Sequence, residues 1–261
     1  MIDAITQEVA QFLTDNEAFR TVEHIQDKVE RCLMEHGFYT EAKSYILYRW
    51  QRTEQRQIMQ RLVDGMADDS LADTFKEIQR DFPDEAYNLK LLADKLSGFM
   101  KRDMNSDERL SAVIKAAIEL TTQDAPDWEF IAARLYHFKL TKKLEAQAEM
   151  RGIRSFYEKL QYLTANCLYG AYILEAYTPE EIEEAATFMR PERNKLFNYS
   201  GLSRLAKRYL ICTHAHEPIE SVQEMYLGIA LHLALPEKTN RLHWVQKFYD
   251  MLSMLLSLIH I

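Results

Sequence analysis

Two histidines have a spacing that metal chemistry could use. His214 and His216 are separated by one residue, so both imidazoles could chelate one ion. Zinc needs about three or four protein ligands, however, and no cluster of cysteines or further histidines accompanies this pair in the sequence. Glu217 and Pro218 mark a loop before a helix that begins after Ser221. The sequence therefore favours a solvent-exposed turn here and predicts no metal site.

A run of acidic residues could suggest general acid–base catalysis. The four glutamates within 180–184 follow Thr178 and Pro179 at a predicted helix start. Catalytic carboxylates must converge in an apolar cleft for their pKa values to separate, whereas acids at a helix start face water and the positive end of the helix dipole. We therefore expect a solvated helix terminus and no catalytic pair.

Three aromatic residues could bind a nucleobase by stacking. Tyr45, Tyr48 and Trp50 lie within one predicted helix. An aromatic stripe at helical spacing more often packs into a core, so we expect these side chains to be buried, with base stacking as the alternative.

The cysteines suggest no reactive centre. Cys32, Cys167 and Cys212 are odd in number and widely spaced, which fits neither a disulfide framework nor a zinc ribbon. The sequence also has no glycine-rich phosphate loop, no nucleophile elbow and no cysteine–histidine pairing. We therefore predict no catalytic residue, and we expect a reducing, cytoplasmic compartment.

The composition indicates an all-α protein. Among 261 residues, 47% are apolar, which is enough to bury a core, while seven glycines and six prolines are few for a chain rich in good helix formers. The formal net charge of −8 argues against a general nucleic-acid partner, because phosphate backbones are bound by clustered Lys and Arg. No segment has the length of a membrane span, so no membrane partner is expected.

Capping signals and apolar spacing place the helices. Capping-box patterns begin at Asn105, Thr178 and Ser221. Apolar residues recur at helical spacing over 222–233 and again over 242–252, which predicts a helical hairpin. Two further helix pairs, 25–46 around a turn at Gly37 and 110–135 around Pro126, form a weak internal repeat.

Several of these segments resemble one known family. Thr121-Thr-Gln-Asp-Ala-Pro-Asp-Trp-Glu-Phe-Ile-Ala-Ala-Arg-Leu135 is similar to a segment of the large subunit of class I ribonucleotide reductases. Residues 21–30 and 42–49 look like the helical end of an ATP-cone, a nucleotide-sensing domain. The likeness continues, in the family's order, through Phe188–Arg193, Asn198–Leu202, Glu220–Tyr226 and Lys247–Asp250.

The resemblance implies a helical bundle in five parts, without the family's catalytic barrel. These parts are the C-terminal helical part of an ATP-cone (1–53), a helical connector (54–104), a cone-related helix pair (105–145), the N-terminal all-helical domain of the large subunit (146–255) and a tail (256–261). The tail departs from the family and looks like the translation of a transposase adapter used in sequencing libraries, so we expect it to be non-native; a native helix end is the alternative.

The resemblance also implies a role and partners. In this family a ten-stranded barrel reduces ribonucleoside diphosphates to deoxyribonucleotides by thiyl-radical chemistry, for DNA synthesis, with a smaller subunit that generates the radical. ATP and dATP are the allosteric effectors, and homo-oligomers are common. None of Cys32, Cys167 and Cys212 matches a barrel motif, so we expect this chain alone to be inactive and to bind no cofactor.

Two residues match the family's effector site. Thr21 corresponds to the threonine that starts the third cone helix, and Arg52 to a basic residue at the end of the fourth, where it would face effector phosphates. The cone's opening β-hairpin has no counterpart here, since residues 1–6 already resemble a later helix. Thr21 as a plain N-cap and Arg52 as a surface charge are the structural alternatives.

A different class of function stays open beside the reductase. The chain could be a non-enzymatic helical module that senses nucleotides or holds a partner. Regulators that borrow an ATP-cone usually add a cysteine-rich zinc ribbon for DNA contact, and this acidic sequence shows none.

Overall fold

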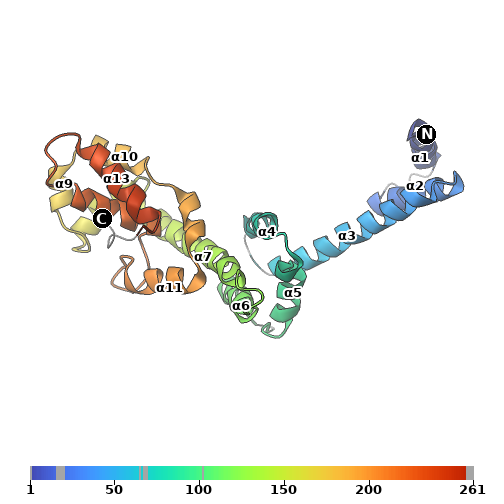
Figure 1. Ribbon diagram of the computed structural model, residues 1–261, viewed down its shortest axis with the longest axis horizontal. Coiled ribbons are helices and arrows are strands. Elements are labelled where there is room, and N and C mark those ends of the chain that lie inside the picture. The colour runs from blue at the N-terminus through green and yellow to red at the C-terminus, as the bar shows by residue number, and fades with distance from the viewer. Residues whose placement is uncertain (1, 16–20, 65, 67–69, 102, 257–261) are drawn as a thin grey trace. The chain divides into compact units, whose positions relative to one another are not determined.

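The computed structural model describes residues 2–15, 21–64, 66, 70–101 and 103–256, and within these ranges the fold is all-α, as expected (Figure 1). The only extended pairing in the described residues is an isolated antiparallel bridge between Cys212 and Pro218. The chain divides into two compact units, Met1–Arg61 and Leu62–Ile261. Five of the six residues of the expected tail, 257–261, lie outside the described residues.

The first unit is built from three helices. They are α1 (Ile2–Asp15), α2 (Val22–Glu35) and α3 (Tyr39–Val63), the last of which continues two residues past the division. α1 packs against α2. Gly37 has a φ of +78°, a left-handed conformation that ends α2 and lets α3 fold back beside it. α3 runs for 25 residues because neither Gly nor Pro interrupts it.

The second unit begins with helices that pack around the Thr121–Leu135 segment. They are α4 (Ser70–Asp81), η2 (Glu85–Tyr87), α5 (Leu89–Ser97), α6 (Ser106–Glu119) and α7 (Trp128–Arg151). Trp128 is fully buried, and its indole Nε1 donates to the Ala86 carbonyl at 3.0 Å, while its ring lies edge-on to Tyr87. α6 and α7 lie side by side as the predicted helix pair (Figure 1).

The remaining elements enclose the largest core. They are α8 (Phe156–Ala165), α9 (Tyr172–Ala176), α10 (Pro179–Ala186), η3 (Pro191–Leu196), α11 (Tyr199–Arg208), α12 (Val222–Leu233) and α13 (Arg241–Ser253). α12 and α13 pack as the predicted hairpin. The core contains side chains such as Leu160, Ile182, Leu227 and Tyr249, each no more than 1% exposed. Among the described residues, none of the helices combines the length and apolar character that a bilayer crossing requires.

The three predicted capping boxes are confirmed. Asn105, Thr178 and Ser221 each accept a hydrogen bond from the backbone three residues on, and the glutamate at that position caps in return. Two of the four glutamates after Thr178 have structural partners, since Glu181 completes the box and Glu183 accepts from the Tyr157 backbone N–H at 2.9 Å. The acidic run is therefore a helix start, as expected.

Segments that carry the family resemblance meet in one buried polar network. The Tyr249 hydroxyl of α13 donates to the Gln223 side chain of α12 at 2.5 Å and accepts from the Arg190 backbone N–H at 2.7 Å. Arg193 donates to Ser253 at 2.5 Å and pairs with Asp250 at 2.7 Å. Because buried polar groups are costly unless they are bonded, this network fixes η3 against the α12–α13 hairpin.

Candidate functional site

The two predicted effector residues lie on the α2–α3 hairpin. Thr21 is the N-cap of α2, and its Oγ1 accepts from the His24 backbone N–H at 3.3 Å and lies 2.7 Å from His24 Nδ1. Arg52 lies within α3, not at a helix end as the resemblance suggested, because α3 continues through Val63. The N-cap assignment of Thr21 is thus confirmed, and an effector role for either residue stays a prediction.

Ion pairs fix the antiparallel register of the hairpin. Arg49 of α3 lies 2.5 Å from Asp27 and 3.4 Å from Glu30 of α2, and these carboxylates raise the pKa of its guanidinium. In an antiparallel pair with this register, the start of α2 lies opposite the residues that follow Arg49. Thr21 and Arg52 therefore belong to the same end of the hairpin, although no contact joins them directly in the described residues.

A hollow of about 210 Å³ lies between α2 and α3 beside Arg49; we call it the Arg–Tyr hollow. Its lining residues come from both helices and are Gln26, Tyr45, Tyr48, Arg49, Arg52, Thr53 and Arg56. Arg52 Nε donates to the Tyr48 hydroxyl at 2.9 Å, and its guanidinium carbon lies 5.3 Å from the centroid of that ring. No carboxylate pairs with Arg52 or Arg56 in the described part of the chain.

The prediction that the aromatic residues of α3 are buried was wrong for two of the three. We expected Tyr45, Tyr48 and Trp50 to be buried, but Tyr48 is 54% and Trp50 60% exposed, and Tyr45 is half-buried at the hollow. Helical spacing gives the face on which residues lie but not whether another element covers that face. Exposed tyrosine rings beside arginines can stack on a base while guanidiniums bind phosphate oxygens in pairs.

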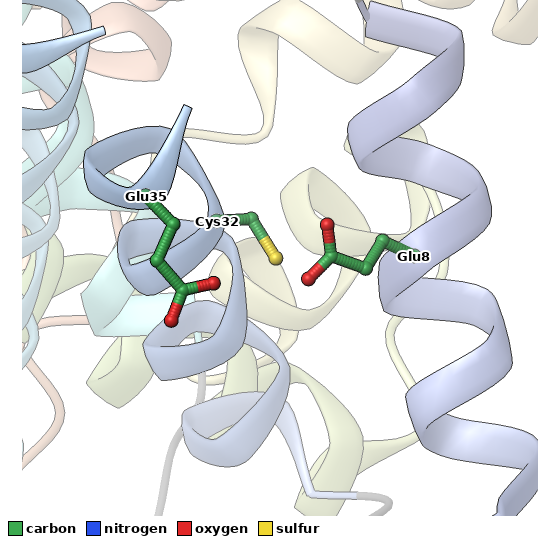
Figure 2. Close-up of side chains that lie close together, drawn as sticks. All are labelled: Glu8, Cys32 and Glu35. Atoms are coloured by element: carbon green, nitrogen blue, oxygen red, sulfur yellow. The ribbon is translucent and has the colours of Figure 1, made fainter. Parts of the chain in front are cut away.

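A second cluster of chemically capable groups lies between α1 and α2. Figure 2 shows Glu8 of α1 pointing toward Cys32 and Glu35 of α2, whose ligand atoms all lie within 4.8 Å of one another. Lys28 Nζ lies 2.7 Å from Glu8, and hydrogen bonds from Lys28 and then His36 lower the pKa of Glu8 to about 2. Lys28 therefore already supplies the positive charge that Glu8 needs, and the cluster links two helices.

The histidine pair lies where the sequence placed it. His214 and His216 are exposed in the turn closed by the Cys212–Pro218 bridge, and His216 has a φ of +61°. The expected turn is therefore confirmed. Nothing in the sequence indicated that this turn would meet α7, because the contact between them, from Gln147 Nε2 to Glu217 Oε2 at 2.5 Å, joins residues 70 positions apart.

Each of the two units contains a match to a known protein family. The chain matches the model of the ATP cone domain over residues 1–54 and that of the ribonucleotide reductase all-alpha domain over residues 195–257. It is 47% identical over 234 residues, 90% of its length, to the ribonucleoside-diphosphate reductase subunit alpha of Treponema pallidum (strain Nichols), of which it covers 28%. The chain belongs to the family of ribonucleoside-diphosphate reductase large subunits.

Two further relatives support the assignment to this reductase family. The ribonucleoside-diphosphate reductase 1 subunit alpha of Escherichia coli (strain K12) is 35% identical over 54% of this chain and 18% of the relative. The subunit alpha of enterobacteria phage T4 is 30% identical over 62% of this chain and 21% of the relative. The chain thus spans less than a third of the length of these reductase subunits. The ATP-cone match covers α2, α3 as far as residue 54 and the lining residues of the Arg–Tyr hollow apart from Arg56.

Proposed function

We propose that this chain is the nucleotide-sensing and supporting region of a ribonucleoside-diphosphate reductase large subunit. In that role it serves an enzyme that reduces ribonucleoside diphosphates to deoxyribonucleoside diphosphates together with a small radical-generating subunit. The observation that carries the proposal is the ATP-cone match over residues 1–54, on which the basic and aromatic hollow is built. A reducing cytoplasmic compartment and a homo-oligomer are parts of the same proposal.

The effector contacts proposed within this region are Thr21 and Arg52. The Arg52 guanidinium has no carboxylate partner in the described residues, so its free N–H groups can take phosphate oxygens of ATP or dATP. The start of α2 adds backbone N–H groups beside Thr21, which favour negative charge. The Tyr48 ring holds Arg52 in place and offers a face to the base.

Calorimetric titration of this chain with ATP and dATP tests the proposal. We expect weak binding, with a Kd of about 1 mM (about −4 kcal/mol), because the resemblance implies that the hairpin is only the helical side of a cone site. Arg52→Gln should weaken the binding further by about tenfold, the effect of one charge-assisted contact. Arg31→Gln, the same charge change on an exposed α2 position outside the hollow, should leave the affinity unchanged.

Two results would count against these assignments. Micromolar affinity for dATP would contradict the weak, one-sided site. Equal affinities for the Arg52→Gln and Arg31→Gln proteins would remove Arg52 from the effector contacts, while leaving the family membership untouched.

A further inference from the structure

A second basic hollow lies entirely within the second unit; we call it the lysine hollow. Its volume is about 260 Å³, and it lies where α7 and α11, which run side by side in Figure 1, meet the turn that contains His216. The side chains that matter for its chemistry are Lys139, Lys143, Lys207, Cys212 and His216. It shares no residue with the Arg–Tyr hollow.

The walls of the lysine hollow are held by packing and hydrogen bonds. Leu140 and Ala206 are 5% and 7% exposed and give it an apolar floor. The turn is closed by the Cys212–Pro218 bridge and by the Thr213 N–H, which donates to the Glu217 carbonyl at 2.8 Å. Cys212 and His216 are therefore presented to the hollow by an ordered turn.

Lysines outnumber the carboxylates that pair with them at the lysine hollow. Lys139 is held by Asp107 at 2.8 Å and by Ser111 at 2.5 Å, and Lys143 is 3.9 Å from the same carboxylate. Lys207 and His216 are exposed and have no acidic partner within the described ranges. One carboxylate thus serves two ammonium groups, in a chain whose formal net charge is −8. A concentration of uncompensated cations on such a protein attracts anions.

We propose that the lysine hollow binds a small phosphorylated anion. Its phosphate lies among Lys143 and Lys207, which donate charge-assisted hydrogen bonds, with the His216 ring beside them, and its less polar part lies over Leu140 and Ala206. This site is separate from the proposed effector contacts on the α2–α3 hairpin, so neither depends on the other.

The cysteines of the chain provide a direct readout. Cys212 lines the lysine hollow and is half-buried, whereas Cys167 is exposed elsewhere and Cys32 is buried. Burial raises the pKa of the Cys212 thiol, so alkylation with iodoacetamide is best measured at about pH 9, where more thiolate forms. Inorganic pyrophosphate should slow alkylation of Cys212 several-fold at constant ionic strength and leave Cys167 unchanged. Equal effects on the two cysteines, or none on Cys212, would overturn the proposal.

Repeating the protection experiment with ADP in place of pyrophosphate identifies the kind of ligand. Protection of Cys212 by ADP at lower concentration than by pyrophosphate would assign the apolar floor to a nucleoside. Protection at the same concentration would assign the site to the phosphate groups alone. Both results support an anion site and differ in what the floor contributes.

Substitutions separate this site from the α2–α3 hairpin. Lys207→Gln and Lys143→Gln should each raise the pyrophosphate concentration needed for protection by about tenfold, since each removes one charge-assisted contact. Lys142→Gln, on the same helix but outside the lining, is the matched control. Arg52→Gln should leave Cys212 protection unchanged, so failure here is distinguishable from failure of the effector proposal. If pyrophosphate protected Cys212 equally well in the Lys207→Gln, Lys143→Gln and Lys142→Gln proteins, the proposed site would be refuted.

Discussion

At the scale of single residues, Glu220 is the most unusual group of the second unit. It is only 5% exposed, and Oε2 accepts from the Ile211 backbone N–H at 3.0 Å. Burial, with a smaller contribution from the neighbouring Glu224, raises the pKa of Glu220 to about 7, although the Ile211 hydrogen bond and Lys159 lower it. A carboxylate in this position anchors the segment around Ile211 that leads into the turn of the lysine hollow, at an electrostatic cost.

That cost gives a prediction for pH dependence. Because the pKa of Glu220 is higher when folded than its ordinary value of 4.5, its contribution to stability is complete below about pH 4.5 and is lost as pH rises to about 7. Glu220→Gln removes this titration and retains an oxygen acceptor for the Ile211 N–H. We expect the variant to gain roughly 2–3 kcal/mol relative to the parent protein between pH 4.5 and pH 8, measured by urea unfolding.

Glu180→Gln is the comparison for this experiment, because Glu180 is exposed at the start of α10. The difference in unfolding free energy between the Glu180→Gln protein and the parent protein should be the same at pH 4.5 and at pH 8. A Glu220→Gln protein that kept the parent's pH profile would show that the buried carboxylate does not titrate in this range.

At the scale of elements, the α2–α3 hairpin depends on one left-handed residue. Gly37 has a φ of +78°, and a Cβ there would meet nothing within 4 Å, so the cost of a side chain is conformational and not steric. Gly37→Ala should destabilise the hairpin by about 1–2 kcal/mol. Gly37→Asn should lose less, because Asn tolerates this conformation. Amide hydrogen exchange in α2 measures both effects.

Gly98 supplies the matched substitution. It also follows a helix, but its φ is −72°, and the nearest atom to an added Cβ is the Lys95 carbonyl oxygen at 3.5 Å. Gly98→Ala should therefore be neutral or slightly stabilising in urea unfolding. A similar loss from the two Ala substitutions would show that turn geometry does not determine hairpin stability.

Elements were more predictable than the sites they build. The capping boxes at Asn105, Thr178 and Ser221 follow from four local residues each, so the sequence alone was sufficient. The exposure of Tyr48 and Trp50 was mispredicted, because periodicity does not reveal which face is covered. The burial of Glu220 and the two hollows depend on contacts between distant segments, for which no local signal exists.

At the scale of the whole molecule, the family assignment rests on agreement between separate features. The ATP-cone match covers α1, α2 and part of α3, and the all-alpha domain match begins in η3 and ends after α13. Segments that prompted the resemblance, around Arg190, Gln223 and Tyr249, are joined by the buried polar network. Distant motifs that bond to each other in the core support one shared fold more strongly than any one of them alone.

The same scale gives the last prediction, which concerns catalysis. The family resemblance implies a cysteine pair that passes electrons to the substrate, and none of Cys32, Cys167 and Cys212 matches the motif that would carry that pair. Incubated with a ribonucleoside diphosphate, a dithiol reductant and the small subunit of a relative, this chain should form no deoxyribonucleotide above the no-protein blank. A full-length relative in the same assay must turn over. Product that persisted after substitution of all three cysteines by serine would point to a contaminant, whereas product lost with them would place redox chemistry in these helices.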